Sequence, residues 1–77
     1  MAATHAVLNV PSVSCNHCKM AIEGAVNALD GVAAVDVDVP AKSVSVDFDA
    51  GSVSLDTIEA AVRDEGYAVA GHHVFGD

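Results

Sequence analysis

The spacing of apolar residues switches between two periods along this chain, and this switching limits the possible folds more than any other feature. Apolar and polar side chains alternate over residues 4–10, 32–39 and 43–48, which is typical of strands with one buried face. Over residues 18–29 and 55–62 apolar side chains recur every three or four positions, which is typical of helices with one apolar stripe. The pattern therefore predicts strand, helix, strand, strand and helix in that order.

A loose internal repeat adds a sixth element. Leu29-Asp30-Gly31-Val32 resembles Asp64-Glu65-Gly66-Tyr67, so each helix is expected to stop at a glycine and to be followed by a strand, the last one at residues 67–70. Right-handed crossovers then place both helices on the same side of the sheet. We expect an α+β, ferredoxin-like βαββαβ fold with a four-stranded antiparallel sheet and two helices on one face. Residues 1–71 form this domain in our interpretation, and residues 72–77 form a C-terminal tail.

Specific side chains are expected to form the core, and Ser54 is expected to cap the second helix. The expected core residues of the strands and helices are Ala6, Leu8, Val10, Ile22, Val26, Leu29, Val35, Val37, Val39, Val44, Val46, Phe48, Leu55, Ile58 and Val62.

Charge and hydropathy exclude several functions. The 77 residues carry a net charge of -8 with only three Lys and Arg residues, which disfavours binding to nucleic acid and to anionic lipid. No apolar run is long enough to cross a membrane, and the first residues lack the features of a secretory signal. We therefore expect a cytoplasmic protein without membrane insertion.

The segment Cys15-Asn16-His17-Cys18 is the one constellation with evident chemistry. It lies between the first strand and the first helix, so both sulfurs are expected near a helix N-terminus, where backbone amides and the nearby Lys19 favour thiolates. Two soft thiolates suit Cu(I), whereas a structural zinc site needs two more ligands. Two-coordinate binding also leaves the ion open to a third thiolate from a partner, which indicates a carrier and not an enzyme.

Three segments together resemble the heavy-metal-associated domain family, and most of all its free-standing bacterial copper(I) chaperones. They are Val13-Ser14-Cys15-Asn16-His17-Cys18, Leu29-Asp30-Gly31-Val32 and Glu65-Gly66-Tyr67, and the likeness extends over residues 5–70. The resemblance implies that Cys15 and Cys18 bind Cu(I) and that the ion passes to the N-terminal metal-binding domain of a copper-transporting P-type ATPase. Some relatives deliver copper to a copper-responsive repressor instead.

The chain departs from the family pattern at the loop. Val13 stands where relatives have a methionine that anchors the loop in the core, so the loop is expected to keep its site but to be looser or shifted. Ser14 stands where relatives in zinc and cadmium pumps have an aspartate ligand, which favours Cu(I) over Zn(II). Tyr67 matches an aromatic residue that bacterial chaperones place near the metal loop.

The remaining candidates have weaker arguments. His17 is either a third ligand or an exposed loop residue, and Met20 is expected to pack against the core and not to bind metal. His5 is expected on the outer face of the first strand, and His72 and His73 in a solvated tail.

Two other functions stay open from the sequence. Cys15 and Cys18 could act as attacking and resolving thiols of a thiol–disulfide oxidoreductase, or they could carry Zn(II), Cd(II) or Hg(II). We expect a monomer, with a copper-bridged dimer as a further possibility.

Overall fold

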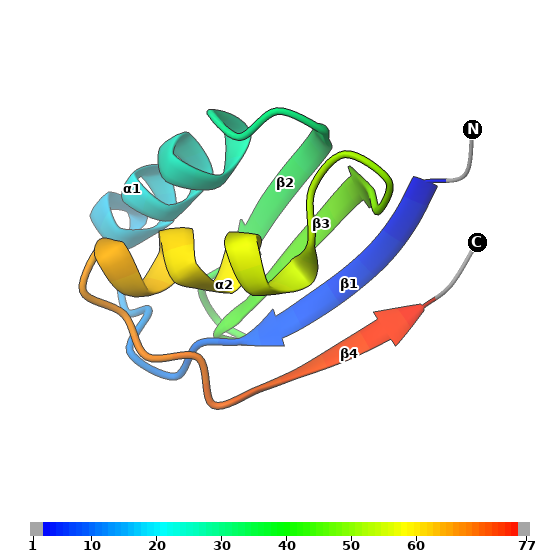
Figure 1. Cartoon of the computed structure of the whole chain (residues 1–77). Coiled ribbons are helices and arrows are strands. Elements are labelled where there is room, and N and C mark those ends of the chain that lie inside the picture. The colour runs from blue at the N-terminus through cyan, green and yellow to red at the C-terminus, as the bar shows by residue number, and fades with distance from the viewer. Residues whose placement is uncertain (1–2, 76–77) are drawn as a thin grey trace.

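A computed structural model of the chain describes residues 3–75. Its elements follow one another along the chain in the expected order, strand, helix, strand, strand, helix and strand (Figure 1). They are β1 (Ala3–Asn9), α1 (Asn16–Asn27), β2 (Val32–Asp38), β3 (Ser43–Asp49), α2 (Leu55–Asp64) and β4 (Gly71–Phe75).

The four strands form one antiparallel sheet in the order β2-β3-β1-β4. β1 lies between β3 and β4, and the hairpin of β2 and β3 places β2 at one edge of the sheet. Both helices pack on the same face, and the other face is open (Figure 1). The ferredoxin-like α+β fold expected from the sequence is confirmed.

The core lies between the helices and the sheet, as the alternating pattern predicts. The strands contribute every second side chain, for example Ala6 and Leu8 from β1, and the helices contribute one stripe each, including Ile22 and Ile58. The fully or almost fully buried apolar residues are Ala6, Leu8, Val10, Val13, Ile22, Val26, Val37, Val44, Val46, Phe48, Val53, Ile58 and Val62. Leu29, Val35, Val39 and Leu55, also expected in the core, are partly buried against it.

The first helix ends two residues earlier than expected, although its glycine has the expected conformation. α1 ends at Asn27, and Gly31 lies in the following turn with φ +96°. A Cβ atom on Gly31 would lie 2.8 Å from Cβ of Ser52 and 3.0 Å from Cγ1 of Val53, so the chain passes too close for any side chain there. Gly31 is therefore required by both a left-handed backbone and a close approach.

The helix α2 begins and ends as the sequence predicts. The Ser54 hydroxyl accepts a hydrogen bond from the Thr57 amide and caps the N-terminus. At the other end Gly66 has φ +95°, its amide donates to the Arg63 carbonyl, and the Tyr67 amide donates to the Val62 carbonyl. This is a Schellman motif, and it turns Tyr67 back toward the core.

The expected last strand is wrong, because the strand lies at residues 71–75 and not at 67–70. The segment from Tyr67 to Ala70 crosses from α2 to the sheet without pairing over its length, and only the Ala70 amide reaches β1, at the Asn9 carbonyl. Four residues of the expected tail, 72–75, therefore belong to the sheet, and residues 76–77 lie outside the described part.

Candidate metal centre

The two cysteines meet at the N-terminal tip of α1. Cys15 is the N-cap residue, with extended backbone angles, and Cys18 lies in the first helical turn. The Lys19 amide donates to the Cys15 carbonyl, which closes this turn and brings the two sulfur atoms to 3.6 Å. Cys15 is exposed and Cys18 is partly buried, so the pair faces solvent from one side.

The helix tip favours negative charge on these sulfurs. α1 has no side-chain cap at its N-terminus and no acidic residue in its first turn. Its first amides therefore keep their partial positive charge, which acidic or capping side chains would otherwise neutralise. Such a tip stabilises thiolates.

Hydrogen bonds lower the pKa of Cys18 from 9.0 to about 6. The largest contribution comes from the Tyr67 side chain, followed by backbone hydrogen bonding at Ser14, whereas partial burial works in the opposite direction. The same contact raises the pKa of Tyr67, because its hydroxyl proton is held by the sulfur. Near neutral pH the Cys18 sulfur is therefore mainly a thiolate.

Tyr67 reaches this position because the Schellman turn at Gly66 directs it inward. Its ring packs against the core while its hydroxyl faces Cys18. Both roles that the sequence suggested for this residue, a core aromatic and a neighbour of the cysteines, are present together.

The loop ahead of the cysteines is anchored in the core. Val13 is fully buried, and its amide donates to the Val10 carbonyl at 3.1 Å. Lys42, in the turn between β2 and β3, donates through Nζ to the Val13 carbonyl at 2.8 Å, and its own carbonyl accepts from the Val10 amide. Sequence analysis missed this role of Lys42, because only its turn position was visible and the contact joins segments far apart in the chain.

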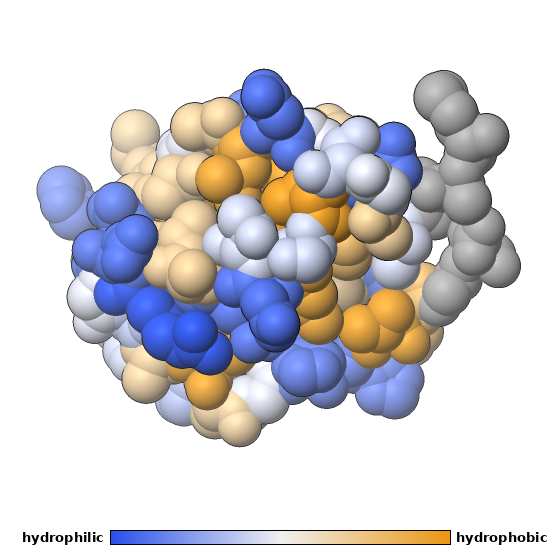
Figure 2. Space-filling model, in the orientation of Figure 1, coloured by the Kyte–Doolittle hydropathy of each residue, from blue (hydrophilic) through white to orange (hydrophobic). Residues whose placement is uncertain are grey.

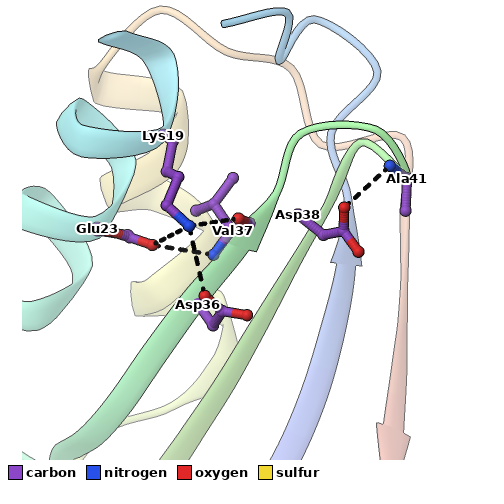
Figure 3. A network of polar contacts seen from close by, with 6 residues as sticks. All are labelled: Lys19, Glu23, Asp36, Val37, Asp38 and Ala41. Carbon is purple, nitrogen blue, oxygen red and sulfur yellow. Dashed lines mark hydrogen bonds and ion pairs between the residues drawn. The ribbon is translucent and has the colours of Figure 1, made fainter. Parts of the chain in front are cut away.

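The charge of Lys19 is directed toward β2 (Figure 3). Its Nζ lies 3.1 Å from the Val37 carbonyl oxygen, 3.4 Å from Glu23 Oε2 and 3.5 Å from Asp36 Oδ1. Partial desolvation alone would lower the pKa of Lys19, but the Glu23 and Asp36 carboxylates outweigh it and raise the pKa. Lys19 is not among the groups that lower the pKa of Cys18, so its expected role as a cation beside the thiolates finds no support.

His17 and Met20 both lie on the outside of α1. His17 is exposed in the first turn, between the two cysteines. Met20 is 71% exposed, so the expectation that it packs in the core is wrong. It lines a shallow groove between α1 and β2 together with Gly24 and Val35.

The other histidines belong to the sheet. His5 lies on the outer face of β1, as expected, with its Nδ1 atom 2.5 Å from Asp47 Oδ1. On β4, His72 contacts the buried Glu59, and the ring of His73 lies against that of Phe75. These contacts replace the solvated tail that the sequence suggested for His72 and His73.

Among residues 3–75, no group of three or more His, Cys, Asp or Glu side chains is arranged to hold a metal ion. The cysteine loop thus presents two sulfur donors. In the same part of the chain, neither helix has the length and apolar character needed to cross a bilayer.

Comparison with known proteins gives consistent results. The sequence model of the heavy-metal-associated domain matches residues 7–68. The protein named copper chaperone CopZ of Staphylococcus aureus (strain NCTC 8325 / PS 47) is 43% identical over 63 residues, which are 82% of this chain and 93% of that protein.

Two solved structures extend the likeness to three dimensions. A structure of a CopZ metallochaperone has a TM-score of 0.84 and 41% identity, over 86% of this chain and 98% of that one. The N-terminal domain of a potential copper-translocating P-type ATPase from Bacillus subtilis, in its Cu(I)-loaded state, has a TM-score of 0.80 and 24% identity, over 95% and 92% of the two chains. The second likeness concerns the fold alone.

Proposed function

The chain belongs to the heavy-metal-associated domain family, and from this we propose that it is a cytoplasmic copper(I) chaperone that binds Cu(I) between Cys15 and Cys18. Its acceptor is the N-terminal metal-binding domain of a copper-transporting P-type ATPase, or a copper-responsive repressor. It acts as a carrier without catalytic turnover. The observation that carries this proposal is the pair of sulfurs, 3.6 Å apart, at an uncapped helix tip.

The donor set favours a soft ion of low coordination number. The Cys18 sulfur is a thiolate donor near neutral pH, since its pKa is about 6, and the Cys15 sulfur lies 3.6 Å from it as the second donor. Thiolates suit soft ions such as Cu(I), and two of them suit an ion of low coordination number, whereas a closed zinc site takes four ligands. Ser14, directly ahead of Cys15, adds no carboxylate that would favour a harder ion.

The exposure of the loop supports transfer by ligand exchange. Cys15 is exposed, so a thiolate of the acceptor can approach the bound ion from solvent without unfolding the loop. The incoming sulfur forms a third bond to Cu(I), one of the two cysteines of this chain then leaves, and the copper keeps its oxidation state throughout. Repeating the exchange once more transfers the ion completely.

Anaerobic titration with Cu(I) tests the proposal. We expect the reduced protein to bind one equivalent tightly and in preference to Zn(II). Cys15→Ser and Cys18→Ser should each lose the tight binding while keeping the fold, because the buried core contains neither sulfur. The control variant His17→Ala keeps both cysteines and should bind Cu(I) with nearly unchanged affinity if two thiolates suffice. Failure of the reduced wild type to bind Cu(I), or stronger binding of Zn(II), contradicts the proposal.

A thiol–disulfide oxidoreductase is the second candidate, because a thiolate of low pKa next to a second sulfur also suits disulfide exchange. The two functions differ in their need for metal. An insulin-reduction assay on the metal-free protein should show no turnover above that of free thiol. Turnover at the rate of a dedicated oxidoreductase would favour this second function.

A further inference from the structure

The two edges of the sheet differ in how their backbone groups are covered. At the β2 edge, Lys19 donates to the Val37 carbonyl and Glu23 accepts from the Val37 amide, each at 3.1 Å (Figure 3). The two side chains of α1 thus occupy the positions that a neighbouring strand would take. Proteins protect strand edges in this way because uncovered backbone groups pair with strands of other chains.

The β4 edge has no comparable cover among residues 3–75. β4 pairs with β1 along one side, and no element lies along its other side (Figure 1). On the helix side of the sheet, the side chain of His72 contacts α2, with Nδ1 2.7 Å from Glu59 Oε2. The outer row of backbone groups on β4 therefore stays available for pairing.

The β4 strand carries no acidic side chain and ends in exposed apolar residues. Its sequence Gly-His-His-Val-Phe contains no acidic residue, although the whole chain carries a charge of -8. Val74 is 46% and Phe75 47% exposed, and they are two of the three large hydrophobic residues that are exposed in the described part of the chain. Hydrophobic surface is visible at the end of β4 in Figure 2.

The acidic side chains of the open sheet face lie on the opposite half. Asp36 and Asp38 belong to β2, and Asp47 and Asp49 belong to β3. Two copies of this chain repel each other through their net charge of -8, and on the open sheet face β4 is the strand farthest from β2 and is separated from β3 by β1.

We propose that the β4 edge is an interaction surface for a second copy of this chain, and that two β4 strands pair antiparallel to join the two sheets. Centred on His73, this pairing places His73 opposite its counterpart and Phe75 opposite Gly71. The contact is the same on both copies, so it closes at a dimer. A basic partner is a poorer occupant, because β4 itself carries no acidic side chain and the carboxylates of the open face lie on β2 and β3.

This dimer goes beyond the proposed copper chemistry and does not depend on it. It uses no cysteine and no metal, unlike a copper-bridged dimer. Its dependence on salt is also distinctive: salt screens the repulsion between two acidic chains, so association should strengthen as sodium chloride is raised.

Analytical ultracentrifugation of the reduced, chelator-treated protein tests the proposal. We expect a reversible dimer whose fraction rises from micromolar to millimolar protein and rises again with salt. His73→Lys places two like charges opposite each other at the centre of the pairing and should weaken dimerisation by about fivefold or more. Cys15→Ser should dimerise like the wild type.

His5→Lys is the matched control. It makes the same change on the same open face, one strand further from the edge and beside Asp47. Its ring lies 5.6 Å from that of Phe75, between centroids, but not in the β4 backbone pairing, so association should weaken much less than in His73→Lys. Circular dichroism confirms that both variants fold. A wild type that stays monomeric at all concentrations and salt levels overturns the proposal. So does equal weakening by His73→Lys and His5→Lys, or loss of the dimer in Cys15→Ser.

Discussion

The chemistry of the cysteine loop depends on a single side chain that is distant in sequence. Tyr67 is the largest contributor to the low pKa of Cys18, and it is placed there by the turn at Gly66. Within residues 3–75, the more exposed Cys15 sulfur has Cys18 as its side-chain hydrogen-bond partner and no tyrosine. The two thiols of the motif are therefore chemically unequal.

Replacement of the Tyr67 hydroxyl tests this inequality. In Tyr67→Phe the ring and its packing remain, but the hydrogen bond to Cys18 is lost, so the pKa of Cys18 should rise from about 6. The pH dependence of alkylation by iodoacetamide, compared with and without this substitution in a Cys15→Ser background, measures the shift. An unchanged profile would show that the hydroxyl does not stabilise the thiolate. The unfolding midpoint serves as the control and should change little.

The same thiol gives the folded protein a defined pH dependence. The pKa of Cys18 is lowered from 9.0 to about 6, so between these values the unfolded chain binds more protons than the folded one. Stability should therefore rise with pH across this window, and the contribution should vanish as pH falls through about 6. Chemical denaturation as a function of pH measures it, and Cys18→Ser should flatten the curve. A wild type and variant with parallel curves would contradict the prediction.

At the scale of elements, the sequence pattern predicted every strand and helix that buries an apolar stripe. Ala6 and Leu8, or Ile58 and Val62, reveal their elements because burial and periodicity coincide. The pattern did not predict β4, because its side chains are mostly exposed and its position is set by backbone pairing with β1. The alternation at residues 67–70 was misleading, since Tyr67 and Val69 pack on the core from an irregular segment.

In the metal centre, too, the features set by local sequence were predictable and the contacts between distant segments were not. The place of Cys15 and Cys18 at the start of α1 could be predicted from a local motif. The partners of Lys19 on β2 and of Lys42 at Val13 could not, because a long side chain can reach several segments and only the folded chain selects one.

Two glycines of similar appearance in the sequence should respond in opposite ways to alanine. Gly31→Ala introduces a Cβ 2.8 Å from Ser52 Cβ at a positive φ, so it should destabilise the protein by about 2–4 kcal/mol. Gly24→Ala lies within α1 with no neighbouring atom within 4 Å of the new Cβ, and it should stabilise the protein by about 0.5–1 kcal/mol. Urea denaturation measures both.

Gly66→Ala separates the two causes of the instability expected for Gly31→Ala, which are backbone strain at positive φ and close approach to Ser52. Gly66 has φ +95° but open space around the new Cβ, so its replacement carries the backbone strain alone. It should destabilise the protein by about 1–2 kcal/mol. A loss as large as that of Gly31→Ala would show that close packing at Ser52 adds nothing.

At the scale of the whole molecule, the few cations are held in internal contacts, so the negative charge at the surface is little offset. All three cations of Lys and Arg type are engaged within the chain: Lys19 with Glu23 and Asp36, Lys42 with the Val13 carbonyl, and Arg63 with Glu59. Most acidic side chains of residues 3–75 consequently have no Lys or Arg partner. Such a surface keeps the protein soluble but opposes the compact state through self-repulsion.

Added salt should therefore stabilise the folded chain. Sodium chloride screens repulsion among exposed carboxylates over distances of about 10 Å at 0.1 M, whereas the partly buried contacts of Lys19 and Lys42 are screened less. We expect the thermal midpoint to rise from low to moderate salt, measured by calorimetry at a protein concentration low enough to keep the chain monomeric. Asp30→Asn combined with Asp64→Asn removes two exposed carboxylates and should raise the midpoint at low salt and flatten its salt dependence. A midpoint that falls with salt would mean that ion pairs such as Lys19–Glu23 contribute more to stability than the surplus of negative charge takes away.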